Sequence, residues 1–337
     1  MNAQATMILP DTEIQPASAE QRFPDDAPPL TMEGMFYPLG FPLRVRTNSA
    51  EVLRQCAKKW DIFEPRTNAQ PMETDVHVVE THSTECPPLM KCHFMGNMLV
   101  AVADTHNVCV AEFPWGKTRM VISTAALRHP HYFSQTFLEA APATQLSTRF
   151  TTSIHAACVV LDGRGVLLCG NSGAGKTSLS YACARAGWQF LADDTSHLLQ
   201  DETTRRVIGN CHQVRFRPSA AELFPEIAGA EITPRMFGKP SVELPTAPMD
   251  YLQTVSSAEV DFVVFLNRHH PGSAELVPYS RDDARLYMRQ VLFGTPETKI
   301  HRHAAIDRLL TAEVLELRYH SLDQAVQRLE RLVREAR

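Results

Sequence analysis

The stretch GVLLCGNSGAGKTSLSYACARAGWQFLADD, residues 165–194, decides the fold of this chain. Residues 170–177 match the pattern G-x-x-x-x-G-K-[ST], a loop whose successive backbone N–H groups surround phosphates. An apolar run over residues 166–169 precedes the loop and predicts a buried strand. The apolar residues after the loop recur at the spacing of a helix that buries one face: Leu179, Ala182, Cys183 and Ala186. A strand, a loop and a helix in this order favour a phosphate-binding loop over an ordinary glycine-rich turn.

The loop itself supplies the predicted nucleotide-binding residues. Its glycines let the backbone approach the phosphates closely. Lys176 is expected to reach the outer phosphates, and the hydroxyl of Thr177 to bind Mg²⁺. ATP is the predicted nucleotide, although no motif that reads a base distinguishes it from GTP. The predicted nucleotide-binding set is Gly170, Asn171, Ser172, Gly173, Ala174, Gly175, Lys176, Thr177 and Ser178.

Two adjacent carboxylates follow the next predicted strand. Residues 188–192 are mostly apolar, and Asp193 and Asp194 come directly after them. Because parallel strands joined by helices gather ligands at their carboxyl ends, we expect both aspartates beside the loop. One would hold Mg²⁺ and the other would accept a proton from an attacking hydroxyl, since neighbouring carboxylates push their pKa values apart. The alternative is an aspartate pair that caps a helix on a surface loop.

These residues resemble the HPr kinase/phosphorylase family, which includes serine kinases found beside peptide and polysaccharide biosynthesis genes. The resemblance rests on the motif at 170–177, on ARAGWQFLADD at 184–194 and on SIHAACVVLDGRG at 153–165. The family places a histidine and an aspartate pair at the same distances from its loop lysine as the chain does. The close match covers about residues 150–195.

The resemblance implies roles for individual residues. Asp193 would be the general base that deprotonates a serine hydroxyl, Asp194 would help to hold Mg²⁺, and His155 would lie near the transferred phosphate. The roles of the two aspartates are open to exchange. The implied fold is an α/β P-loop kinase domain of the HPr kinase C-terminal type, similar to phosphoenolpyruvate carboxykinase and containing mixed strands. An oligomer of identical chains is also implied as a possibility.

One family signature departs from the expected pattern. The form Glu-x-Arg-Gly-x-Gly becomes Gln213-Val-Arg215-Phe-Arg217 here, so the arginine stays while the acidic residue and the glycines are replaced. Neutral glutamine binds Mg²⁺ more weakly than a carboxylate. The departure favours a kinase relative with an acceptor other than HPr over a bifunctional kinase/phosphorylase. Arg215 is kept as a predicted nucleotide contact, with a solvated edge strand as the alternative.

Length and composition limit the other possibilities. A chain of 337 residues suggests two domains, and a net charge of −5 gives no reason to expect a nucleic-acid partner. None of the apolar runs reaches the length of a transmembrane helix, so no membrane partner is predicted. The 8 cysteines include no C-x-x-C pair, and several lie in apolar runs, as expected for reduced thiols in the cytoplasm.

We predict three parts along the chain. Residues 1–29 are expected to be a disordered tail, residues 30–147 a smaller α+β accessory domain, and residues 148–337 the catalytic domain. In the accessory domain a helix should follow Asn48 and Ser49. Its predicted strands cover residues 43–47, 76–79, 96–102, 108–113 and 119–123.

Three further features are predicted in the catalytic domain. Residues 207–217 could form one strand with Arg215 and Arg217 on one face. Residues 261–266 read as a buried strand that leads to Arg268, a candidate phosphate contact. Lys239 lies in a Gly/Pro stretch and is either part of a closing loop or an ordinary exposed lysine.

The predicted activity is Mg²⁺-dependent transfer of the γ-phosphoryl group of ATP to a hydroxyl, in the first place that of a serine in a protein or peptide. Lys176, Asp193 and His155 are the predicted catalytic residues, and Thr177 and Asp194 the predicted metal ligands. Two alternatives stay open. One is a kinase for a small-molecule hydroxyl such as a sugar or nucleoside, and the other is a nucleotide sensor without catalysis.

Overall fold

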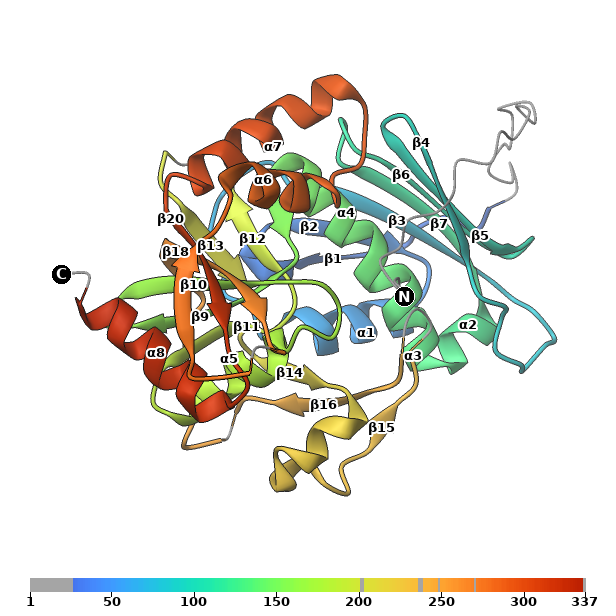
Figure 1. Cartoon of the computed structure of the whole chain (residues 1–337). Coiled ribbons are helices and arrows are strands. Elements are labelled where there is room, and N and C mark those ends of the chain that lie inside the picture. The colour runs from blue at the N-terminus through green and yellow to red at the C-terminus, as the bar shows by residue number, and fades with distance from the viewer. Residues whose placement is uncertain (1–26, 201–202, 236–238, 248, 270, 336–337) are drawn as a thin grey trace. The chain divides into compact units, whose positions relative to one another are not determined.

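The computed structural model describes residues 27–200, 203–235, 239–247, 249–269 and 271–335. Most of the predicted tail, residues 1–26, lies outside these described residues. The chain divides into two compact units, an N-terminal unit that extends to Arg149 and a C-terminal unit that begins at Phe150. Both units combine helices with sheets, so the chain has a mixed α/β fold (Figure 1).

A seven-stranded sheet forms the N-terminal unit, in the order β1-β2-β3-β7-β6-β5-β4. Strands β4 to β7 form an antiparallel meander, whereas β2, β3 and β7 run parallel to one another. The predicted strand over 43–47 is confirmed, and β4 was not predicted. The bounds are β1 Met32–Phe36, β2 Leu43–Thr47, β3 Met72–Val79, β4 Lys91–Met95, β5 Met98–Asp104, β6 Asn107–Glu112 and β7 Lys117–Ser123.

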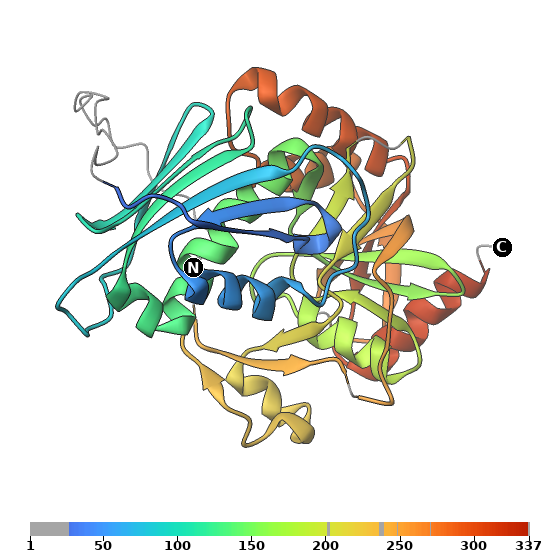
Figure 2. The same cartoon turned by 180° about the vertical axis from the view of Figure 1, so that it is seen from behind.

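Helix α1, Ala50–Trp60, connects the parallel strands β2 and β3 (Figure 2). Val52, Cys56 and Trp60 bury one face of it, and the Trp60 ring lies 5.9 Å from that of Phe36 in β1. The predicted helix is therefore confirmed, although the side chain of Ser49 makes no capping hydrogen bond. The helices after β7 were not predicted: α2 Thr124–Arg128, α3 Pro130–Phe133, a π-helical turn Ser134–Glu139 and α4 Ala140–Arg149.

The C-terminal unit is built on a ten-stranded sheet of mixed direction. Its main path is β17-β11-β9-β10-β18-β13-β12-β8, and β20 pairs with both β18 and β19. The bounds are β8 Thr151–Ile154, β9 Ala156–Leu161, β10 Arg164–Cys169, β11 Gln189–Ala192, β12 Ser196–Leu199, β13 Arg206–Gly209, β17 Gln253–Thr254, β18 Ser257–Asn267, β19 Glu275–Pro278 and β20 Glu313–Arg318.

Helices cover both faces of this sheet. Val166 and Leu168 of β10 pack in the core that includes α5 and α8, whereas Leu167 and Cys169 pack in the core that includes α6 and α7. A central strand with two covered faces is apolar throughout, which explains the continuous apolar run before the loop. The helices are α5 Lys176–Arg185, α6 Arg281–Arg289, α7 Pro296–Leu309 and α8 Leu322–Glu335.

Two expectations about the strands need correction. β10 and β11 are not joined directly, because antiparallel β9 lies between them and pairs with both. They still run in the same direction, so their carboxyl ends lie at one edge of the sheet. The single strand predicted over 207–217 is wrong: a turn at Asn210 separates β13 from β14, Gln213–Phe216, and Arg217 lies beyond β14.

β14 belongs to a separate three-stranded sheet, with β16, Ser241–Pro245, between it and β15, Ile232–Thr233.

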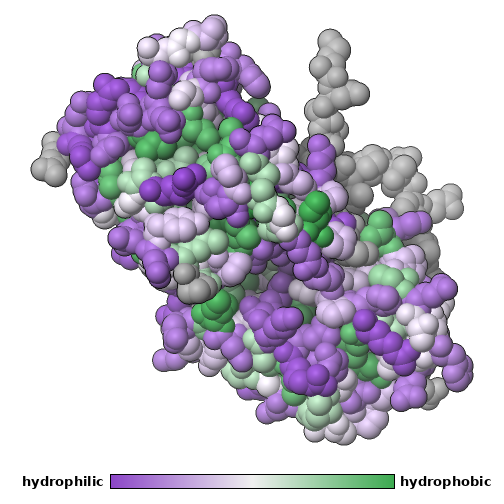
Figure 3. All heavy atoms as spheres, turned by 90° about the horizontal axis from the view of Figure 1, so that it is seen from below, coloured by the Kyte–Doolittle hydropathy of each residue, from purple (hydrophilic) through white to green (hydrophobic). Residues whose placement is uncertain are grey.

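Figure 3 shows one face of the molecule, where hydrophilic side chains prevail and hydrophobic ones form separate patches. Throughout the described ranges, no helix has both the length and the apolar character that crossing a bilayer requires.

A buried histidine in β12 is expected to make the stability of the fold depend on pH. His197 is 8% exposed, and its Nδ1 lies 3.2 Å from Ser153 Oγ. Burial lowers its pKa from 6.5 to about 4, so between these values the unfolded chain binds the additional proton and stability falls as pH falls. We expect His197→Asn to remove up to roughly 3 kcal/mol of this loss.

The measurement is the urea midpoint of both proteins from pH 7 to pH 4. Other groups titrate equally in the two proteins, so the difference between their curves isolates His197. Parallel curves over the whole range would show that His197 does not carry this pH dependence.

Candidate functional site

The loop between β10 and α5 has a backbone that its glycines make possible. Gly170, Gly173 and Gly175 have φ values of +153°, +90° and +98°, which other residues rarely adopt. A Cβ on Gly175 would lie 2.9 Å from the Tyr319 hydroxyl oxygen, so the last glycine also prevents a clash. The residue before α5 is Gly175, which has no side chain to cap the helix, so the first N–H groups of α5 are open to an anion.

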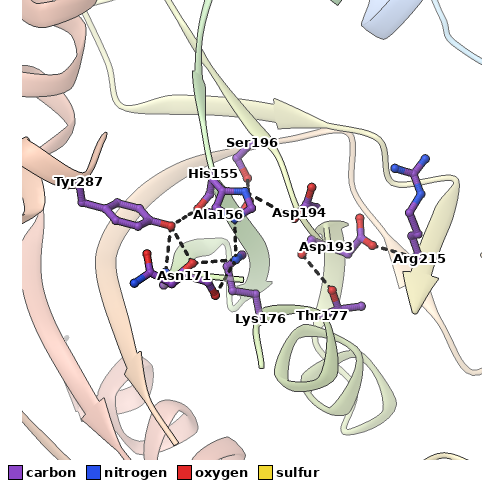
Figure 4. A network of polar contacts seen from close by, with 11 residues as sticks. His155, Ala156, Asn171, Lys176, Thr177, Asp193, Asp194, Ser196, Arg215 and Tyr287 are labelled. Carbon is purple, nitrogen blue, oxygen red and sulfur yellow. Dashed lines mark hydrogen bonds and ion pairs between the residues drawn. The ribbon is translucent and has the colours of Figure 1, made fainter. Parts of the chain in front are cut away.

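Lys176, the first residue of α5, directs its ammonium group back into the loop (Figure 4). Only 6% of the residue is exposed. Its Nζ donates to Gly170 O at 2.7 Å and contacts His155 Nε2 at 2.9 Å, with Asn171 O at 3.5 Å. Burial lowers the pKa of this ammonium group, and the nearby charge of Asp194 opposes the shift.

His155 connects Lys176 with the aspartate pair. It lies between β8 and β9, and its Nδ1 is 3.5 Å from Asp194 Oδ1. Because an ammonium group can only donate, Nε2 must accept from Lys176, which places the imidazole hydrogen on Nδ1, facing Asp194. Burial and then the charge of Lys176 lower the pKa of His155, so the imidazole is mainly neutral at pH 7.

Asp193 and Asp194 follow β11 and differ in their surroundings. The side chain of Asp194 is 55% exposed, whereas the Asp193 carboxylate accepts the backbone N–H of Arg215 at 2.7 Å. Desolvation raises the pKa of Asp193 to about 6, the charge of Asp194 adds to the shift, and the hydrogen bond from Arg215 opposes it. The two carboxylates are therefore suited to different tasks.

The described residues contain no group of three or more His, Cys, Asp or Glu side chains that could hold a metal ion alone. Mg²⁺ in nucleotide sites takes one or two protein ligands and completes its shell with phosphate and water. Thr177 lies on the Asp193 side of the loop, where its hydroxyl donates to the backbone carbonyl of Asp193 at 3.5 Å. Thr177 and the exposed Asp194 carboxylate therefore fit such a cation.

The structure brings together five of the predicted residues at one edge of the sheet, namely His155, Lys176, Thr177, Asp193 and Asp194 (Figure 4). Arg215 meets them through its backbone, while its Nε pairs with Glu243 Oε1 at 3.2 Å. Of the remaining candidates, Arg268 is exposed and lies beside the loop, since its Cδ would be 3.6 Å from a Cβ placed on Gly175. Arg217 follows β14, and Lys239 is exposed just before β16.

Several residues that contact the loop or share a partner with Arg215 were missed by sequence reasoning. The Tyr319 hydroxyl lies 3.5 Å from Ala174 O, and the Tyr287 hydroxyl contacts Gly170 and His155. Arg235 pairs with the same Glu243 oxygen as Arg215 does, at 3.1 Å. These residues come from β15–β16, α6 and the segment after β20, far from the motif in sequence, and no local pattern marks them.

Comparisons with known proteins give little beyond this geometry. No protein-family model matches the chain, and no curated protein does. Among solved structures, that of the Hpr(Ser) kinase/phosphatase from Coxiella burnetii is similar over 55% of this chain and 93% of that chain. The sequence identity is 16% and the TM-score 0.28.

Asp193 is expected to reduce the stability of the free protein above pH 6. Its folded pKa of about 6 exceeds the ordinary value of 3.8, so stability is lost as pH rises from 3.8 to 6. Asp193→Asn keeps an acceptor for the Arg215 N–H and removes the desolvated, partly buried charge. We expect it to raise the free energy of unfolding at pH 8 by up to roughly 3 kcal/mol.

Asp194→Asn is the matched control, because Asp194 is exposed and adjacent in sequence. The charge of Asp194 contributes less to the Asp193 shift than burial does, so the expected effect on the free energy of unfolding is smaller, within about 1 kcal/mol. Urea unfolding of the three proteins at pH 8 and pH 4 measures both effects. A destabilised Asp193→Asn protein at pH 8 would contradict the raised pKa.

Proposed function

We propose that this chain is an ATP- and Mg²⁺-dependent phosphotransferase that moves the γ-phosphoryl group of ATP to a hydroxyl group. The observation that carries the proposal is the buried Lys176 ammonium, held at an uncapped helix N-terminus beside two carboxylates of different character. A nucleotide sensor needs the loop and the lysine but has no use for a carboxylate with the properties of Asp193.

Each residue has a proposed task. The N–H groups at the start of α5 and the ammonium of Lys176 bind and orient the phosphates. Thr177 and Asp194 would hold Mg²⁺, which neutralises phosphate charge when it is bound. Asp193 takes the proton of the attacking hydroxyl, and its pKa of about 6 leaves it ionised at pH 7 yet more basic than an ordinary carboxylate.

A serine in a protein or peptide is the acceptor that we propose. The support is the likeness of residues 150–195 to the HPr kinase/phosphorylase family and its serine-kinase relatives. The replacement of the family's acidic residue by Gln213 favours an acceptor other than HPr. A metabolite hydroxyl is the competing acceptor, and the experiment below distinguishes the two.

Lys176→Ala should lower the rate of phosphoryl transfer at least about a hundredfold, because it removes a charge that stabilises the transition state. The purified protein and the variant are incubated with Mg²⁺ and γ-labelled ATP. Each receives a size-fractionated lysate, HPr or pooled metabolites. Label on a macromolecule that is absent with Lys176→Ala identifies a protein or peptide acceptor, and label on a small molecule identifies a metabolite kinase.

Tight ATP binding without transfer to any fraction would support the nucleotide sensor against the proposal. Near-normal transfer by Lys176→Ala would show that the loop is not the site of the reaction.

The two aspartates should be separable in kinetics. Asp193→Asn is expected to lower kcat about a hundredfold or more with ATP affinity kept, because it removes the base but not the phosphate contacts. Asp194→Asn should instead raise the Mg²⁺ concentration needed for half-maximal rate. Steady-state rates over a Mg²⁺ series measure both effects. The opposite pattern would exchange the two roles, and wild-type behaviour of both variants would exclude the pair from the reaction.

A further inference from the structure

Tyr287 of α6 reaches across to the start of the phosphate-binding loop (Figure 4). Its hydroxyl oxygen lies 3.2 Å from the donating N–H nitrogen of Gly170 and 2.8 Å from Gly170 O. The same oxygen lies 2.8 Å from His155 O. One side chain thus contacts both polar groups of the first loop residue and the backbone of the histidine that faces Lys176.

A hydroxyl has one hydrogen to donate, so at any moment Tyr287 donates to only one of the two carbonyls. It can accept from the Gly170 N–H at the same time. Gly170 O in turn accepts from Lys176 Nζ at 2.7 Å. Tyr287 is therefore one residue removed from the ammonium group that we propose binds phosphate.

The partly buried Tyr287 ring packs against the core. It meets the Phe265 ring edge-on at 5.3 Å, and Phe265 stacks on Tyr279 at 4.2 Å. Met288, the next residue of α6, is 1% exposed and anchors the helix in the same core. Burial raises the pKa of Tyr287, which keeps its hydroxyl protonated over the physiological range.

The backbone of Gly170 needs contacts from other residues to fix its conformation. Its φ of +153° is open to glycine and rare for other residues, and glycine restricts its own backbone least. A rotation of this peptide would carry away the carbonyl that orients Lys176. Contacts to both polar groups of Gly170 oppose such a rotation.

We propose that Tyr287 is a positioning residue, which fixes Gly170 and His155 relative to one another and, through the Gly170 carbonyl, the ammonium of Lys176. This role rests on the proposed function of the loop and adds to it a residue from a distant helix. Tyr287 does not touch the phosphates in this role, so it acts through Lys176.

Tyr287→Phe keeps the ring and removes the hydroxyl. We expect the Kd for ATP with Mg²⁺, measured by calorimetry on the full chain, to rise about five- to tenfold, the effect of losing one hydrogen bond. The matched control is Tyr279→Phe, because Tyr279 packs on the same Phe265. Within the described part of the chain, no hydrogen bond of the Tyr279 hydroxyl is seen. The Kd of the Tyr279→Phe protein for ATP should therefore stay within twofold of the wild-type value.

A double-mutant cycle separates positioning from a general structural effect. In a Lys176→Met background, Tyr287→Phe should change the Kd less than twofold, because the ammonium that it positions is gone. Equal weakening in both backgrounds, or wild-type affinity of Tyr287→Phe itself, would overturn the inference. A wild-type protein that binds no ATP would overturn the proposed function instead, so the two failures are distinguishable.

Discussion

The burial of a lysine ammonium against a glycine carbonyl is the interaction around which the candidate site of the C-terminal unit is arranged. Lys176 Nζ lies 2.7 Å from Gly170 O, with 6% of the residue exposed. A buried charge is costly unless polar groups surround it. The loop carbonyls, His155 and the two carboxylates provide that surrounding, and each comes from the end of a different strand. β10 and β11 run in the same direction, which brings the loop and the two aspartates to one edge of the sheet.

The sheet supports this arrangement because both of its faces are covered. Val166 and Leu168 pack toward α5 and α8, while the intervening residues pack toward α6 and α7. Strands fixed on two sides hold their carboxyl ends in place, and those ends carry the loop and the aspartates. Helix α6 also brings Tyr287 to the loop, and it does so from the face of the sheet opposite to the one that α5 covers.

Sequence reasoning found what local patterns encode. It predicted the strand from the apolar run at 166–169, the loop from its glycines and α5 from its helical period. Each of these signals depends on neighbours along the chain. The insertion of β9 between β10 and β11 depends on pairing across the sheet, which no local pattern reports. The break after Gly209 had a signal, since Gly-Asn is a turn dipeptide, but the strand pattern on each side concealed it. Tyr287 had none, as it lies 117 residues from Gly170.

Burial disfavours the charged forms of three ionisable groups in the site. Burial is the largest cause of the lowered pKa of Lys176, the lowered pKa of His155 and the raised pKa of Asp193, so each charged form is disfavoured in the free protein. Phosphates beside Lys176 would favour its charged form, and a cation beside the carboxylates would favour theirs. In the proposed function, the nucleotide and Mg²⁺ therefore add opposite charges to those that the folded chain already supplies, and the new charge pairs offset part of the desolvation cost.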